Sequence, residues 1–523
     1  MQTELDNLLS LDPNSLTDDE AIDRIGQLID LAAELQDEKA LHSSLVWCEM
    51  AHQRGLSHTH RSVLHYFQAN AWSALIAIRQ NASLDQLDWS GETSEWSEKE
   101  VISLRRSRNG EGFQSLPDNA RCRVLTNLGC ALDRLGRFSE AVECLDEAID
   151  IDRLFGMAWG NRGIALTSYA RGLPHLPHAP GLCSTTAFLK EALGSLELAL
   201  ALTLDPGSEK SFEKYRSFLA ERRGEDHEPL IDLDSPSLGE SEAEQAYRGW
   251  SLSHRLFINP LNDLGNLSAA ALDVLHLPAI TVSINTGPYY ESFFNQMKQE
   301  FVSARFLFYE GITATSPHFS DSGVTLYDTT DYPVFGLSIE RVKLALRSTY
   351  SLFDKMAFFL NYYLQLGIPA KQVNFRSFWY KSQNPKQGLK ADIDGRCNWA
   401  LRGMFWLAKD LYDSRPEFRD AMEPEAREID VIRNHAEHKL LRVHEFPENT
   451  AWARGTMPDE ALFSIDRDGL YSRTMRMLKL TRSALVYLAY AVHIEEMRKQ
   501  QARGSDEKIM NLEIEWIDDG RKR

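Results

Sequence analysis

The feature that most constrains the fold is a pair of similar segments at positions 121–206. In the first, large apolar and small residues recur at three- and four-residue spacing, the period of an amphipathic helix. Gly129 and Ala141 are small where two antiparallel helices would cross closely, and Gly136 lies where the chain would turn between them. The pattern predicts stacked helical hairpins, carried by Leu125, Leu128, Gly129, Leu132, Gly136, Ala141, Leu145 and Ala148.

The second segment repeats these offsets at Trp159, Arg162, Gly163, Leu166, Leu198, Ala201, Asp205 and Pro206, around an insertion at 172–181 that is rich in Gly, Pro and His. Both segments resemble tetratricopeptide repeats, and 40–55 and 64–78 resemble degenerate ones. The resemblance covers roughly 30–220. It implies an N-terminal α-solenoid over residues 1–225 whose concave groove binds a protein or peptide partner. A plain array of helical hairpins without a ligand groove is the alternative.

Residues 226–337 differ in character and predict a linker followed by a small mixed α/β connecting segment. Charged residues with Pro and Ser at 221–240 are typical of a linker. The run Ala279–Ile284 predicts a short strand, and residues 285–288 its turn. Residues 316–332 are rich in Ser, Asp, Thr and Gly and predict a loop.

Helical periodicity returns over residues 338–500. Helices are predicted at 339–366, 399–412, 424–444 and 472–500, and four helices of this length form a bundle. Residues 501–523 form a highly charged tail. The predicted fold class is therefore mainly α, a repeat solenoid followed by a helical bundle.

Composition limits the possible partners. The formal net charge is −19, so nucleic acid would have to bind in a local basic cleft. The N-terminus shows no signal peptide, and no apolar run is long enough to span a bilayer. The six cysteines form no C-x-x-C pair, which predicts free, buried thiols. We expect a cytoplasmic protein without a membrane partner.

The third predicted bundle helix contains the sequence Arg433-Asn434-His435-Ala436-Glu437-His438. It resembles the HEPN superfamily, whose ribonucleases carry an Arg followed by four to six residues and a His, usually with a polar residue after the Arg. Arg433, Asn434 and His438 match this pattern. The runs at 350–355, 375–379 and 437–439 are similar to the HEPN branch that accompanies tetratricopeptide repeats, and this resemblance covers roughly 280–500.

The resemblance implies RNA cleavage without a metal or other cofactor. Arg433 would hold the scissile phosphate, because a guanidinium matches phosphate oxygens with two donors. His438 would be the general acid or base, Asn434 would orient either group, and the RNA 2′-hydroxyl would be the nucleophile. HEPN domains pair so that two such sets line one cleft, which implies a homodimer or higher homo-oligomer.

A helical wheel gives a physical expectation for this helix. At about 100° per residue, Ile429, Ile432, Ala436, Leu440 and Val443 form an apolar stripe that should face the bundle. Asn434 and His438 share the opposite face. The alternative for Arg433 is an ordinary helix-surface ion pair with Glu437 or Asp430.

Further RNA contacts are expected from cations that recur every three residues on the last helix, Arg473, Arg476, Lys479 and Arg482. Arg376 begins a second basic set that interleaves with Phe375, Phe378 and Trp379, a pattern that can track phosphates and stack bases. A solvated helix face is the alternative. His435 and His444 lack the spacing of zinc ligands, so no metal is expected.

Two functions are therefore considered. The first is a defence or toxin-like HEPN ribonuclease regulated by its repeat domain. The second is a non-catalytic scaffold whose repeats bind a protein and whose bundle dimerises. Nucleotide-hydrolase, serine-hydrolase and zinc-protease motifs do not occur in the sequence.

Overall fold

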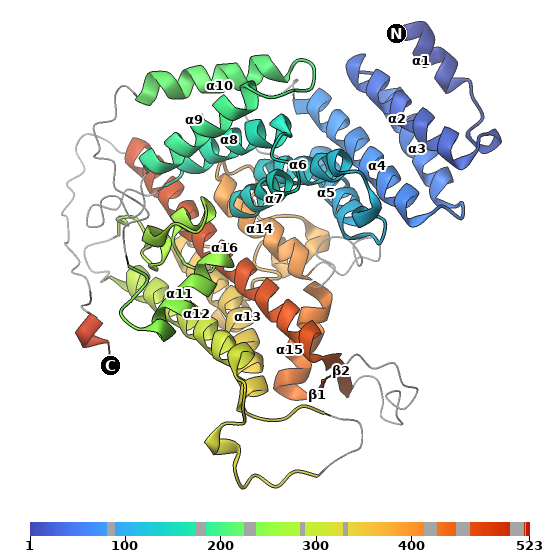
Figure 1. Cartoon of the computed structure of the whole chain (residues 1–523). Coiled ribbons are helices and arrows are strands. Elements are labelled where there is room, and N and C mark those ends of the chain that lie inside the picture. The colour runs from blue at the N-terminus through green and yellow to red at the C-terminus, as the bar shows by residue number, and fades with distance from the viewer. Residues whose placement is uncertain are drawn as a thin grey trace.

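The secondary structure of the described residues is mainly helix (Figure 1). The computed structural model describes residues 1–80, 89–173, 185–223, 237–282, 288–327, 333–412, 426–445, 461–502, 517 and 519–522. Within this part of the chain, the helices α1–α10 form an N-terminal layer, α12–α16 form a bundle beneath it, and one two-stranded sheet lies at the far end of the bundle. The mainly α fold class predicted from the sequence is confirmed.

The N-terminal layer is a row of antiparallel helical hairpins, which we call the repeat array. In each pair, α2/α3, α4/α5, α6/α7 and α8/α9, the two helices pack along one another. The bounds are α1 Gln2–Leu9, α2 Asp18–Glu34, α3 Glu38–His52, α4 His58–Gln80, α5 Glu92–Asn109, α6 Asp118–Arg134, α7 Phe138–Ile151, α8 Gly156–Arg171, α9 Thr185–Leu200 and α10 Ser208–Arg223.

Small residues act in the array as the sequence predicts. A Cβ atom at Gly129 would lie 2.8 Å from the Leu145 side chain and 3.1 Å from the Ala141 carbonyl, so only glycine allows α6 and α7 to approach this closely. Gly136 has φ +83°, a backbone conformation that favours glycine, and turns the chain between these helices. Most of the predicted insertion at 172–181 lies outside the described residues.

The C-terminal bundle is built around the longest helix, α16, which contacts α12, α13 and α14. Long apolar runs explain its central place, because the segment from Ala484 to Val492 is completely or almost completely buried. The bounds are α11 Glu242–Ser253, α12 Tyr289–Thr313, α13 Leu337–Tyr363, α14 Trp399–Tyr412, α15 Ala426–His438 and α16 Arg467–Ala502, with strands β1 Leu440–His444 and β2 Leu462–Asp466.

The array and the bundle share one hydrophobic core. Buried side chains of α6–α9 and of α12–α16 belong to one continuous apolar cluster, whereas α1–α4 pack around a core of their own with Trp96 of α5. At the junction, the ring of Phe138 on α7 lies 4.5–4.9 Å from those of Tyr169, Trp399, Tyr487 and Tyr490. The helices that carry these rings are therefore packed as one body.

Charged side chains reinforce this junction in what we call the inter-unit ion-pair network, Arg105, Arg137, Glu140 and Asp410. Arg105 of α5 donates to both oxygens of Asp410 of α14, at 2.8 and 3.0 Å. Arg137, at the start of α7, binds Asp410 and Glu140 together. All four side chains are almost completely buried, so each charge depends on its partners for stabilisation.

Two predicted elements differ from the structure. Residues 279–282 of the predicted strand do not form a strand within the described part of the chain, and the Thr281 N–H donates to the Glu496 carboxylate at 3.0 Å; residues 283–287 lie outside that part. The helix predicted over 424–444 ends at His438, because residues 440–444 pair in parallel with β2 as strand β1. β-Branched and apolar residues on both strands make this pairing favourable.

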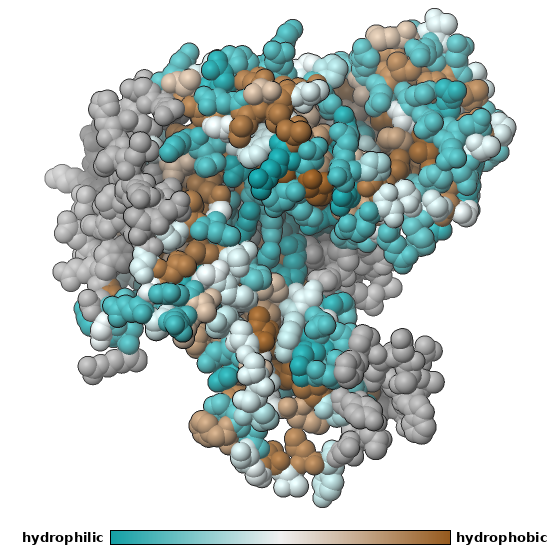
Figure 2. Space-filling view, viewed as in Figure 1, coloured by the Kyte–Doolittle hydropathy of each residue, from teal (hydrophilic) through white to brown (hydrophobic). Residues whose placement is uncertain are grey.

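The loop between α12 and α13 carries an exposed apolar surface at the lower end of the molecule (Figure 2). Phe319 and Tyr327 are 83% and 89% exposed, and Val324, Leu326 and Phe335 are also exposed. The Val334 N–H donates to the Val443 carbonyl at 2.7 Å and joins this loop to β1. Exposed apolar clusters of this kind are typical of interaction surfaces.

No helix among the described residues is long and apolar enough to cross a membrane. Five cysteines are free thiols, as expected, and Cys183 lies outside the described part. Burial was expected for all of them, but Cys397 is exposed, because it lies in the loop before α14 rather than on a helix face.

Candidate functional site

Helix α15 places Arg433 at the surface of the bundle. Ile429 and Ile432 are completely buried and hold the helix against its neighbours, as the wheel predicts. One turn later, the Arg433 guanidinium donates to the Asn434 side-chain carbonyl at 2.9 Å and pairs with the Glu437 carboxylate at 3.1 Å. The ion pair considered as an alternative is therefore present, and Arg433 remains 26% exposed.

Tyr350 of α13 supports Arg433 from beneath. The guanidinium carbon lies 5.2 Å from the centre of the Tyr350 ring, a cation–π arrangement. The Tyr350 hydroxyl donates to Asp430 at 2.8 Å. Burial raises the pKa of this hydroxyl, and the neighbouring Tyr412 and Asp430 raise it further, so Tyr350 remains a neutral donor at physiological pH. The Arg433 guanidinium thus lies over a neutral aromatic ring whose position is fixed by the Asp430 carboxylate.

His438 is the last residue of α15 and is 67% exposed. Its Nε2 lies 3.5 Å from the Glu437 Oε2, the same oxygen that contacts Arg433. The structure therefore brings Arg433, Asn434 and His438 together around Glu437. The predicted apolar stripe does not extend to Leu440 and Val443, because both residues lie on β1 and not on α15. On this strand Val443 is buried and Leu440 is exposed.

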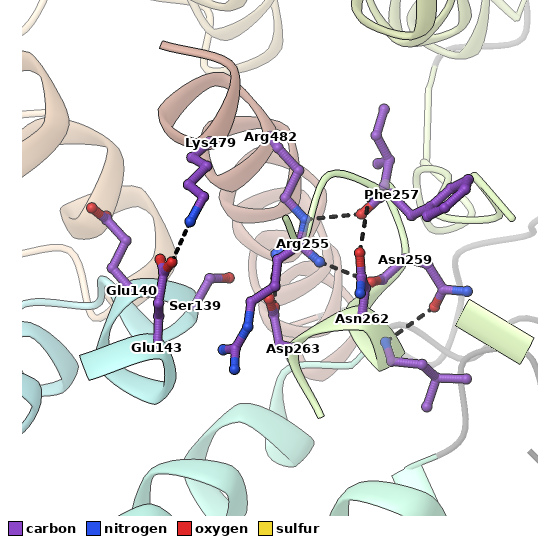
Figure 3. Close-up of polar contacts among 12 residues, drawn as sticks. Ser139, Glu140, Glu143, Arg255, Phe257, Asn259, Asn262, Asp263, Lys479 and Arg482 are labelled. Carbon is purple, nitrogen blue, oxygen red and sulfur yellow. Dashed lines mark hydrogen bonds and ion pairs between the residues drawn. The ribbon is translucent and has the colours of Figure 1, made fainter. Parts of the chain in front are cut away.

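The four predicted RNA contacts on α16 form ion pairs within the chain. Lys479 and Arg482 are shown in Figure 3. Arg473 pairs with Glu428 of α15 at 2.6 Å, Arg476 with Glu140 of α7 at 3.3 Å, Lys479 with Glu143 of α7 at 2.5 Å, and Arg482 with Asp263 at 2.6 Å. Arg476 and Lys479 join the bundle to the repeat array. Their three-residue spacing follows one face of α16, and that face is turned towards the other elements of the chain.

Arg482 is the most deeply buried of the four, at 2% exposure. It also donates to the carbonyls of Phe257 and Asn259, at 2.9 and 2.8 Å, and Asp263 accepts a further bond from Tyr169. In this conformation Arg482 has no access to a polyanion. RNA binding by Arg473, Arg476 and Lys479 stays a prediction that would require their carboxylate partners to be displaced.

Arg376 is exposed, between α13 and α14, and its role as an RNA contact also stays a prediction. The neighbouring aromatic side chains do not support the expected base stacking. Phe375, Phe378 and Trp379 are completely buried and pack against one another in the core. A sequence of alternating basic and aromatic residues is as typical of a loop that buries its aromatic rings as it is of an RNA-binding surface.

His435 on α15 and His444, the last residue of β1, are both buried. His435 Nδ1 lies 2.7 Å from the Val431 carbonyl, and its ring lies 5.7 Å from that of Phe463. Across the described ranges, no group of three His, Cys, Asp or Glu side chains could hold a metal ion. A surface cleft of about 700 Å³, lined by Asp392, Arg396, Glu495, Arg498 and Lys499 among others, contains none of the candidate site residues.

Sequence reasoning missed three features of this region. Glu437 was considered only as a partner of Arg433, although its four-residue spacing from Arg433 and its place beside His438 were a usable signal. The contact of Tyr350 with Arg433 gave no signal, because it joins two helices far apart in sequence. The partners of Arg476 and Lys479 lie 336 residues away on α7 and were equally hidden.

The fold is a row of helical hairpins followed by a helical bundle, and comparison with protein families identifies a domain in each part. Residues 281–495 match the family model described as LA2681-like HEPN, and residues 122–154 match that of the tetratricopeptide repeat. No curated protein matches the chain, and no solved structure does. The chain therefore contains a tetratricopeptide repeat followed by an LA2681-like HEPN domain, the architecture expected from its sequence.

Proposed function

We propose that the protein is a metal-independent RNA endonuclease of the HEPN type. The observation that carries the proposal is the arrangement at the end of α15, where a cation and an exposed imidazole contact one and the same carboxylate oxygen. A phosphate oxygen bound in that place would contact both groups at once. The HEPN match adds support, because cleavage of RNA is common in this superfamily.

The residues would divide the chemistry between them. The 2′-oxygen attacks phosphorus and loses its proton, the bond from phosphorus to the 5′-oxygen breaks, and the 5′-oxygen gains a proton, leaving a cyclic phosphate. Arg433 would neutralise the charge that develops on the phosphate, and Asn434 would hold the guanidinium through its 2.9 Å contact. His438 would transfer one of the two protons, and its exposure leaves room for RNA.

The test is cleavage of total RNA and tRNA by the purified protein in EDTA, wild type against His438→Ala. We expect cyclic-phosphate ends from the wild type and none from the variant. His435→Ala is an unsuitable control because His435 is buried, so His58 is replaced instead, a histidine far away in the sequence whose side chain is 63% exposed and lies beside a glutamate, as that of His438 does. Cleavage that survives in His438→Ala would refute the proposed role of His438.

We also propose a defence or toxin-like role that the repeat array regulates. Ion pairs of α16 connect the repeat array with the candidate site on α15. Arg476 and Lys479 of α16 pair with α7 of the array, and Arg473 of α16 pairs with α15. A protein partner in the array would act by shifting α16 rather than by separating the two units, since they share a core. Overproduction should arrest growth, and Arg433→Ala should relieve the arrest.

The second candidate is a scaffold that binds protein partners and dimerises without catalysis. The ion pair of Arg433 with Glu437 favours it, because both groups are satisfied within the chain. The scaffold predicts no growth arrest and no cleavage by either protein. It also predicts that Arg433→Ala leaves partner binding and the oligomeric state unchanged, which size-exclusion chromatography with light scattering measures.

A further inference from the structure

The Glu437 carboxylate occupies the position between the two candidate catalytic groups. Its Oε2 lies 3.1 Å from the Arg433 guanidinium and 3.5 Å from the His438 Nε2. A non-bridging phosphate oxygen held between a cation and an imidazole would take up similar distances. The oxygen of Glu437 therefore marks an anion-binding position that is already filled by the chain itself.

Arg433 does not depend on Glu437 for its orientation. The Tyr350 ring lies beneath the guanidinium, and Asn434 accepts one of its hydrogen bonds. The Tyr350 ring is itself fixed by the bond from its hydroxyl to Asp430. These contacts would keep the cation in place when the carboxylate leaves, so the anion site would remain formed.

Glu437 is also free to leave. Its side chain is 23% exposed, and within the described part of the chain it pairs with Arg433 and His438. Ion pairs at such partly exposed positions are weak, about 0.2–1 kcal/mol, so an RNA phosphate can displace the carboxylate. By contrast, the carboxylates that bind Arg482 and Arg105 are almost completely buried and are not displaceable at low cost.

We propose that Glu437 is a resident competitor of the RNA phosphate, a carboxylate that keeps the Arg433–His438 site closed to weakly bound anions. This inference rests on the proposed function. RNA must expel Glu437 to reach Arg433, so the residue lowers RNA affinity and favours substrates with additional contacts. Removing its charge while keeping its shape, in Glu437→Gln, is then expected to strengthen binding about 2- to 5-fold.

The experiment measures binding of a short single-stranded RNA with 2′-O-methyl groups at every position, by fluorescence anisotropy at one fixed salt concentration. This probe lacks the nucleophile, so binding is read without cleavage. The matched control is Glu340→Gln, which removes the same charge from an ion pair on α13, where Glu340 pairs with Lys343 and neither residue is a candidate RNA contact. We expect Glu437→Gln to bind more tightly than both the wild type and this control, and Arg433→Ala to bind more weakly.

Two results overturn the inference and leave the proposed function standing. Equal gains from both Gln variants would mean that only the net charge matters. Weaker binding by Glu437→Gln would mean that Glu437 orients Arg433 or His438 for the substrate. A third result, unchanged binding by Arg433→Ala, would remove Arg433 from the RNA site, and both the proposed function and this inference would fail together.

Discussion

Neutralising Asp410 tests whether the repeat array and the bundle are held together by their buried charges. Asp410 accepts from Arg105 and Arg137, and all three side chains are almost completely buried. Asp410→Asn keeps the shape of the side chain but leaves two guanidinium groups short of a negative charge. Breaking a buried ion pair in this way costs about 3–5 kcal/mol. Arg137 retains Glu140, at 2.6 and 2.7 Å, so we expect the lower value, about 3 kcal/mol.

The corresponding change in melting temperature depends on how much of the chain unfolds together. At about 2.1 cal/mol/K per residue, a loss of about 3 kcal/mol lowers the melting temperature by about 3 °C if all 523 residues unfold as one unit. The same loss gives about 7 °C for a unit of about 200 residues. The shared core favours the smaller shift. Differential scanning calorimetry measures the shift and the number of transitions.

The control is Asp150→Asn, the same substitution at an exposed position of α7, which should change stability by about 0.5 kcal/mol or less. A double-mutant cycle with Arg105→Gln adds a second criterion, because residues in one ion-pair network are not independent. The double variant should lose less than the sum of the two single losses. If Asp410→Asn has the same melting temperature as the Asp150→Asn control, or if the stability losses of the two single variants simply add in the double variant, the network does not hold the junction.

Two further predictions concern the repeat array. Burial, reinforced by the nearby His52, lowers the pKa of His65 to about 3. This pKa lies below the value of about 6.5 in the unfolded chain. The contribution of His65 to the free energy of unfolding is therefore complete above about pH 6.5 and is lost as the pH falls towards about 3. At pH 5 the loss from His65 should be about 2 kcal/mol, seen as faster amide exchange in α3 and α4, and absent in His65→Leu. Gly136→Ala should destabilise the fold by several kcal/mol, since a Cβ there would lie 1.9 Å from the Trp399 carbonyl oxygen and φ is +83°. Chemical denaturation measures this loss, with Gly207→Ala as the control. Gly207 has a similar φ of +85° but no atom within 4 Å of the added Cβ, so the comparison separates the steric contact from the backbone strain.

Periodicity predicted most of the helices because apolar spacing is a local property. The helix predicted over 399–412 has those bounds in the structure, and Gly129, Gly136 and Ala141 act as the hairpin pattern requires. The failures are non-local. The Ala279–Ile284 run has strand-like composition, but its described part lacks a neighbouring strand, whereas residues 440–444 pair with β2 across an intervening segment.

The candidate site was predictable in part for the same reason. Arg433, Asn434 and His438 lie on one helix, so their proximity follows from helical geometry, as does the contact with Glu437. The cations of α16 were misleading because sequence shows charge but not the partner that neutralises it. Glu140, Glu143 and Asp263 approach them only after α7 and the segment before α12 have packed on the bundle.

The aromatic cluster around Phe138 has a consequence for how such chains are inherited. Phe138 and Tyr169 come from the repeats, and Trp399, Tyr487 and Tyr490 from the bundle. A recombination event that replaced the repeats with an unrelated sensor would leave the last three rings facing water. The two halves should therefore pass between genomes as a linked pair, and a HEPN domain of this type without repeats should carry smaller or polar residues at the positions of Trp399, Tyr487 and Tyr490.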